Sequence, residues 1–230
     1  MIFNSFSYLI FFPVVTLLYF VLPRKIRWVW LLVSSYYFYM NWHAEYALLM
    51  AASTLVTYIC ALAVSRIAKP KARKAVLVGG IVFNLGMLGY FKYTGMFIDV
   101  LNRACAFLGF EMQLPQVDIL LPVGISFYTF QILSYTVDVY RGTVPAQRNL
   151  IDLAAYIAMF PQLIAGPIVR YSDIAPELRS RTHTLSDAAA GTRRFVLGLA
   201  KKILFANLLG ELVSGFRASQ EQSVLYFWLG

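Results

Sequence analysis

Residues 159–170 read MFPQLIAGPIVR, and this stretch decides which kind of fold to expect. Most of it is apolar enough to lie in a membrane, yet Pro161 and Pro167 each remove a backbone donor and disfavour a continuous helix. Non-helical backbone at membrane depth is tolerated only where it is buried in protein or lines a water-filled cavity. We therefore expect segment 150–169 to be a re-entrant or cavity-lining element, broken at Pro161 and again at Gly166 and Pro167. A merely kinked membrane helix is the alternative.

The composition predicts a membrane protein. Hydrophobic residues make up 60% of the 230 residues, charged residues make up 13%, and the mean hydropathy is +0.65. A soluble domain has about 45–50% apolar and about 25% charged residues. Several apolar runs approach or exceed the roughly 18 residues that suggest a membrane span. We expect an all-α polytopic membrane protein with about five spans, at 6–22, 26–40, 44–64, 75–91 and 120–140, and a surface helix in 92–119.

The distribution of charge predicts the orientation of the chain. The net charge of +9 is concentrated in loops, and the loops at 24–27, 65–74 and 141–202 carry +3, +5 and +5. The segments at 41–46 and 92–118 each carry −1. Because basic loops remain on the cytoplasmic side, the N-terminus is expected outside, and nucleic acid is not an expected partner. If residues 94–110 crossed the membrane, everything after them would invert.

Four polar side chains share one stripe of the segment 120–140. They are spaced 3, 4 and 3 residues apart: Tyr128, Gln131, Tyr135 and Asp138. We expect Ile125, Ile132 and Val139 near the opposite face. Because polar groups facing lipid are costly, the stripe should face other helices or a wet cavity. The wall of a substrate channel and hydrogen bonding between helices remain equally open.

A basic segment follows at 192–216. It combines many Leu, Ile and Phe residues with Arg193, Arg194, Lys201 and Lys202. A helix of this kind lies well in a headgroup layer, with its basic side chains reaching for phosphates. Contact with anionic lipid is the preferred interpretation. A docking surface for a cytoplasmic acyl donor or its acidic carrier is the alternative.

The sequence predicts no catalytic residue of its own. His43 lies in a short outer loop and His183 in a polar stretch, and neither has a partner at motif spacing. Cys60 and Cys105 form no CxxC or metal-like spacing. We therefore expect no metal site and no bound cofactor in these residues.

Four stretches together resemble the membrane-bound O-acyltransferase family, and in particular the bacterial branch that contains the alginate O-acetyltransferase membrane subunit. They are LLPVGISFYTFQILSYTVDVYRG at 120–142, FPQLIAGPIVR at 160–170, RTHTL at 181–185 and GLAKKILFAN at 198–207. The resemblance implies a ring of helices around a thinned centre. It also implies a tunnel from a cytoplasmic donor side to an acceptor site. The implied reaction is acyl transfer from a thioester, either acetyl-CoA or an acyl carrier, to a hydroxyl.

The resemblance further implies a place and partners for the protein. These are the bacterial inner membrane, an exported polysaccharide such as alginate, and periplasmic acetylation partner proteins. The tunnel candidates are Tyr128, Gln131, Tyr135, Asp138, Pro161, Gln162, Gly166 and Pro167. The family's hallmark histidine lies in the second half of a chain about twice this long, and no position here matches it.

The sequence also stops within an apolar run at 224–230, so we expect the N-terminal half of such an enzyme. Two rival interpretations remain. One is a transporter with the broken segment as its gate. The other, if the chain is complete, is a non-catalytic membrane scaffold.

Overall fold

The structure is a computed structural model that describes residues 5–110, 114–115, 117, 119–163, 166–179 and 184–218. Every regular element in these ranges is a helix, and two of the helices are long and apolar enough to cross a membrane. The expected fold class, an all-α membrane protein, is confirmed. The described residues of Phe11–Ser180 form one compact unit, and those of Ile2–Ile10 and Arg181–Gly230 form another. Each unit is described by itself.

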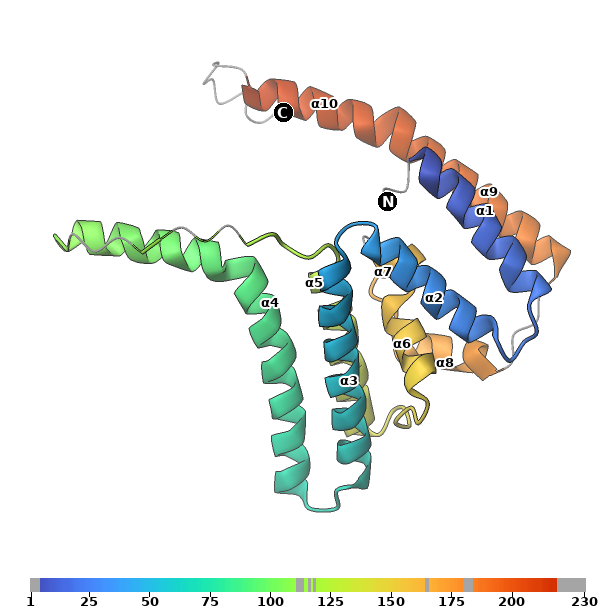
Figure 1. The fold of residues 1–230 in the computed structure, drawn as a ribbon, viewed down its shortest axis with the longest axis horizontal. Helices are drawn as coiled ribbons and strands as arrows, with labels where there is room; N and C mark the ends of the chain where they lie inside the picture. The colour runs from blue at the N-terminus through green and yellow to red at the C-terminus, as the bar shows by residue number, and fades with distance from the viewer. Residues whose placement is uncertain are drawn as a thin grey trace. The chain divides into compact units, whose positions relative to one another are not determined.

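The first unit contains most of the helices, which Figure 1 labels. They are α1 (Phe6–Val21, whose first turn belongs to the second unit), α2 (Arg27–Met40), α3 (Ala44–Arg66), α4 (Pro70–Phe107), α5 (Ile125–Arg141), α6 (Leu150–Ala158), α7 (Phe160–Leu163) and α8 (Tyr171–Arg179). Local signals set several of their ends. Pro70 is the first residue of α4, Gly142 ends α5 at a φ of 79°, and the Asn149 side chain accepts from the Ile151 amide at the start of α6.

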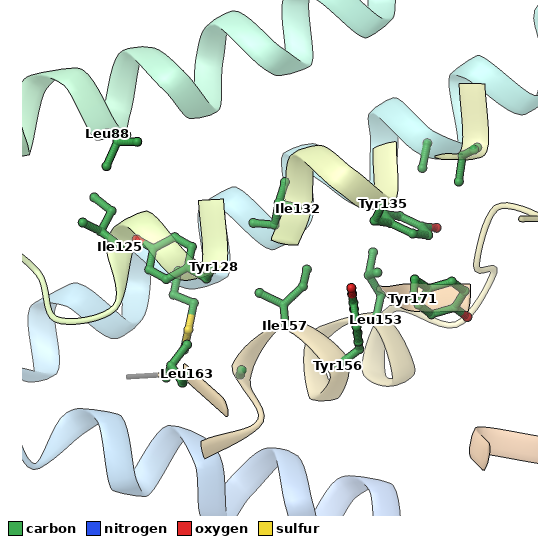
Figure 2. Packing of buried hydrophobic residues seen from close by; sticks show 14 of the residues in the cluster. Leu88, Ile125, Tyr128, Ile132, Tyr135, Leu153, Tyr156, Ile157, Leu163 and Tyr171 are labelled. Carbon is green, nitrogen blue, oxygen red and sulfur yellow. The ribbon is translucent and has the colours of Figure 1, made fainter. Parts of the chain in front are cut away.

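Helix α5 lies at the centre of this unit, in contact with α3, α4 and α6. Tyr128 and Tyr135 are buried along it, but so are Ile125, Ile132 and Val139. The expectation that these three aliphatic residues lie on an opposite face is therefore wrong. Residues three, four and seven positions apart share a helix face, so all five belong to one buried face, of which Figure 2 shows the first four.

Helix α4 is longer than a membrane span. Its 38 residues measure about 57 Å, against about 30 Å for the hydrocarbon core of a bilayer. Its buried residues, Leu77, Gly80, Asn84 and Leu88, all lie in the first half. Figure 1 shows the first half running beside α3 and the second half turning away. The sequence suggested separate elements at 75–91 and 92–119, and the structure joins them in one continuous, bent helix.

The second unit consists of a long basic helix and the first turn of α1. The long helix contains α9 (Leu185–Lys201), the π-helix η1 (Lys202–Ala206) and α10 (Asn207–Ala218). The Tyr8 and Phe195 rings lie 6.5 Å apart. The expected basic segment 192–216 is therefore helical throughout, and large apolar side chains on η1 and α10 are exposed. His183 and the run at 224–230 lie outside the described residues, and membrane crossing by each helix stays a prediction.

Candidate functional site

The predicted break in segment 150–169 begins at Met159. Helix α6 ends at Ala158, Met159 has a ψ of 110°, and the single turn α7 starts at Phe160. The break therefore begins two residues before Pro161. A proline has no amide hydrogen to donate to the carbonyl four residues earlier, and its ring clashes with that carbonyl, so α6 cannot continue through Pro161. Pro161 then lies in the first turn of α7, where no donor is required. A second non-helical stretch runs from Gly166 to Arg170.

Side chains from three helices satisfy the backbone groups that the break releases. The amide of Phe160 would serve the carbonyl of Tyr156 in a continuous helix, but it donates to Ser35 Oγ on α2 at 3.2 Å. The Tyr156 carbonyl instead accepts from Gln131 Nε2 on α5 at 3.0 Å and from Gln162 Nε2 on α7 at 2.8 Å. Gln131 and Gln162, which the sequence placed in two separate segments, therefore donate to the same carbonyl oxygen.

Aromatic and backbone contacts hold α7 in place. The Phe160 ring packs against Phe11, Phe12 and Phe38, with centroids 5.3, 6.4 and 5.6 Å away. On the other side, the carbonyl oxygen of Leu163 abuts Gly124, where an added Cβ would lie only 2.5 Å from it. Gly124 also has a φ of 76°, in the left-handed region that favours glycine. The start of α5 is thus fitted closely against the end of α7.

A second polar network lies near the other end of α6. The Tyr171 ring makes edge contacts with those of Tyr135 and Tyr156, at centroid distances of 4.9 and 5.2 Å. The Gln147 amide donates to the Tyr135 hydroxyl at 2.8 Å, and Gln147 Nε2 donates to the Tyr171 hydroxyl at 2.9 Å. The Tyr156 hydroxyl donates to the Val169 carbonyl at 2.7 Å. These contacts tie the chain on both sides of the break to α5.

The structure brings most of the tunnel candidates together. Figure 2 shows Tyr128 and Tyr135 on α5 facing α6 and Leu163 of α7, and Gln131 and Gln162 share their acceptor there. Asp138 is only half-buried, nearer the far end of α5, where its backbone carbonyl accepts from Thr143. The Gly166 amide donates to the Gln162 carbonyl of α7 at 3.1 Å, and Pro167 follows Gly166 in the sequence. That these residues line a tunnel stays a prediction.

The basic candidates belong to the second unit. Arg193, Arg194 and Lys201 are exposed on α9, and Lys202 is half-buried at the start of η1. Their contact with lipid or with an acyl donor stays a prediction. His43 belongs to the first unit, where it is exposed, with the Trp42 and Tyr46 rings at centroid distances of 6.2 and 5.7 Å.

Comparison with known proteins identifies the family. The chain is 40% identical over 232 residues to the probable alginate O-acetylase AlgI of Pseudomonas aeruginosa, covering 100% of this chain and 44% of that protein. It is 39% identical to the protein of that name from Azotobacter vinelandii, covering 100% of this chain and 46% of that protein. It is 28% identical to the peptidoglycan O-acetyltransferase of Helicobacter pylori, over 95% of this chain and 47% of that protein. The chain belongs to the membrane-bound O-acyltransferase family.

The chain spans about half the length of the curated relatives it matches. No family model matches it, and no solved structure matches it. The recognition made from the sequence motifs is therefore confirmed by whole-chain similarity to curated relatives.

Some residues around the α6–α7 break were missed by sequence reasoning. Ser35, Gly124 and Gln147 each make a contact that shapes the break or its surroundings. The serine pair at 34–35, inside an apolar run, was the available signal for Ser35. Gly124 follows Pro122 just before an apolar helix, which marks a helix start but not its contact with Leu163. Nothing in the local sequence indicates the role of Gln147.

Proposed function

We propose that the protein containing this chain transfers an acetyl group from a cytoplasmic thioester to hydroxyls of an exported polysaccharide. The observation that carries this proposal is the match along the whole chain to proteins named alginate O-acetylase and peptidoglycan O-acetyltransferase. Both names describe transfer of an acetyl group to oxygen. A polymer acceptor such as alginate, and acetyl-CoA or an acyl carrier as donor, fit these names and the family resemblance.

The proposed reaction exchanges a thioester for an oxygen ester. The acceptor hydroxyl oxygen attacks the thioester carbonyl carbon, a C–O bond forms and the C–S bond breaks. The hydroxyl proton leaves with the help of a general base and the released thiolate takes up a proton, so the products are an ester and a thiol. The family resemblance implies a histidine as that base, at a position that these 230 residues do not contain.

In this proposal the chain supplies structure for the transfer path. The α6–α7 break introduces non-helical backbone in an apolar part of the chain, and side chains from α2, α5 and α7 bond to the groups it releases. Such backbone is tolerated at membrane depth when protein surrounds it, which suits the wall of a passage between the two faces. We place the protein in the bacterial inner membrane with its N-terminus outside, as the loop charges suggest.

Loss of the gene tests the proposal directly. The exported polysaccharide of the deletion strain should be made in normal amounts and should lack acetate that mild base releases. The full-length protein should restore that acetate. If the polysaccharide itself were no longer exported, transport would be the better explanation, and unchanged acetate would refute the proposal.

A His43→Ala variant adds a test of where the general base lies. His43 is exposed beside aromatic rings, so the full-length variant should transfer acetyl groups within about twofold of the wild-type rate. A general acid–base residue would instead contribute about 10²- to 10⁴-fold. A loss of that size would place the proton-transfer residue in this chain, contrary to the proposal.

A further inference from the structure

Two buried tyrosines differ from the others around the break. Among the residues described between 11 and 179, the buried tyrosines are Tyr39, Tyr128, Tyr135, Tyr156 and Tyr171. The hydroxyls of the last three take part in hydrogen bonds at 2.7–2.9 Å. Within this part of the chain, the hydroxyls of Tyr39 and Tyr128 have no hydrogen-bond partner. Their side chains are only 2% and 0% exposed, so bulk water does not serve them either.

Both hydroxyls belong to side chains that flank the same break. Tyr39 is one helical turn beyond Ser35, which receives the Phe160 amide. Tyr128 is one turn beyond Gly124, which abuts the Leu163 carbonyl. Tyr39 and Tyr128 belong to one cluster of buried residues, which also contains Leu163 of α7. The pair therefore brings two hydroxyls to the buried cluster around the break, one from α2 and one from α5.

An unpaired buried hydroxyl is unfavourable for folding, because it has lost its bonds to water and gained none in return. A phenylalanine would fill almost the same volume without this cost. Buried polar groups in native proteins are nearly always paired, and an exception calls for a partner that the chain alone does not supply. Ser34 Oγ and Thr129 Oγ1, on the same two helices, are also buried and unpaired within the described residues.

We propose that the hydroxyls of Tyr39 and Tyr128 donate hydrogen bonds to the carbonyl oxygen of the acyl group during its transfer. This inference rests on the proposed function. A hydroxyl donor suits a carbonyl oxygen, which accepts and cannot donate. When the acceptor oxygen attacks, that carbonyl oxygen gains negative charge, and fixed donors in a water-excluded site stabilise it strongly. Both tyrosines keep their protons, and no covalent bond forms to either.

Phenylalanine substitutions in the full-length protein test this inference. Membranes are supplied with acetyl-CoA and the exported polysaccharide, and the rate of ester formation is measured per amount of folded protein. Tyr128→Phe should lower kcat by about 10- to 100-fold with little change in KM for acetyl-CoA, because the bonds strengthen in the transition state. Tyr39→Phe should act in the same direction. The melting temperature of each variant should equal or exceed that of the wild type.

Tyr156→Phe is the matched control for stability. Its hydroxyl donates to the Val169 carbonyl, so its removal should lower the melting temperature. If Tyr128→Phe lowered the melting temperature in the same way, the hydroxyl would have a resident partner and the inference would be overturned. An unchanged kcat in both Tyr128→Phe and Tyr39→Phe would overturn it as well. Wild-type membranes report separately whether the proposed acetyl transfer occurs at all.

Discussion

Replacement of Gln131 and Gln162 by leucine, singly and together, is expected to reveal strong coupling between the two residues. Their side-chain amides donate to the same Tyr156 carbonyl, at 3.0 and 2.8 Å. The amide that would serve this carbonyl in an unbroken helix is occupied by Ser35. The carbonyl therefore depends on the two glutamines, and either one can serve it in the absence of the other.

The magnitude follows from this arrangement. Each single variant removes one hydrogen bond and leaves the carbonyl paired, which should lower the free energy of unfolding by about 0.6–1 kcal/mol. The double variant leaves a carbonyl of the fully buried Tyr156 without a donor. An unsatisfied buried acceptor costs about 1–3 kcal/mol, so the double variant should lose that much beyond the sum of the two single losses.

The assay is reversible unfolding of the full-length protein in mixed micelles of a mild detergent and SDS, followed by tryptophan fluorescence. Trp28 and Trp30 lie on α2, which contacts α6 and α7, so their fluorescence should report separation of these helices. The two single variants are the controls for the double variant. Losses that add to within about 0.5 kcal/mol would show that the glutamines act independently and would refute the shared carbonyl.

Three further predictions follow from other parts of the structure. Gly124→Ala should lower the free energy of unfolding by about 2 kcal/mol or more beyond the loss caused by Gly142→Ala. Both glycines have a positive φ (76° and 79°), but of the two only Gly124 has backbone within reach of an added Cβ. Equal losses in thermal unfolding would contradict this. The loop charges place the second half of α4 outside the membrane. In a background without native cysteines, a membrane-impermeant maleimide added outside should therefore label Asp99→Cys and not Val82→Cys. Labelling of position 99 only from inside would contradict this orientation. Glutamine substitutions at four basic positions should reduce the amount of anionic lipid that mass spectrometry finds with the purified protein, because each basic side chain contributes about 1 kcal/mol of attraction to an anionic membrane surface. The KM for the acyl donor should not rise. A raised KM with unchanged lipid would favour donor docking instead. Those positions are Arg193, Arg194, Lys201 and Lys202.

The break was predictable from the sequence because proline and glycine act on the backbone directly. Pro161 forbids a helical bond to the carbonyl four residues earlier wherever the chain folds, so a discontinuity near it was expected. The partner of the released Phe160 amide is Ser35, which lies 125 residues away in the sequence. No local pattern encodes that pairing. The same holds for the close approach of Gly124 to Leu163.

The reading of α5 was correct in part. The spacing of Tyr128, Gln131 and Tyr135 predicted that they would turn away from lipid, and all three are buried. Ile125, Ile132 and Val139 were expected on the opposite face, but they lie three or four positions from Tyr128 or Tyr135 and therefore share their face. Helix α5 contacts α3, α4 and α6, and the face that they enclose carries polar and apolar residues alike. The continuity of α4 past Tyr90 was missed because polar residues at 92–103 suggested the end of a span, although none of them prevents a helix.

The hydrogen bond between Ser35 and Phe160 has a consequence for the order of assembly. In the folded chain, the carbonyl of Tyr156 and the amide of Phe160, which would pair in a continuous helix, have different partners. Gln162, on α7 itself, can serve the Tyr156 carbonyl, but the Phe160 amide becomes paired only when α2 is already in position to supply Ser35. Contacts of such long sequence separation form late, because the intervening chain must first be ordered. The α6–α7 break is therefore complete only after α2 is in place, and a misplaced α2 would leave the Phe160 amide unpaired in an apolar part of the chain.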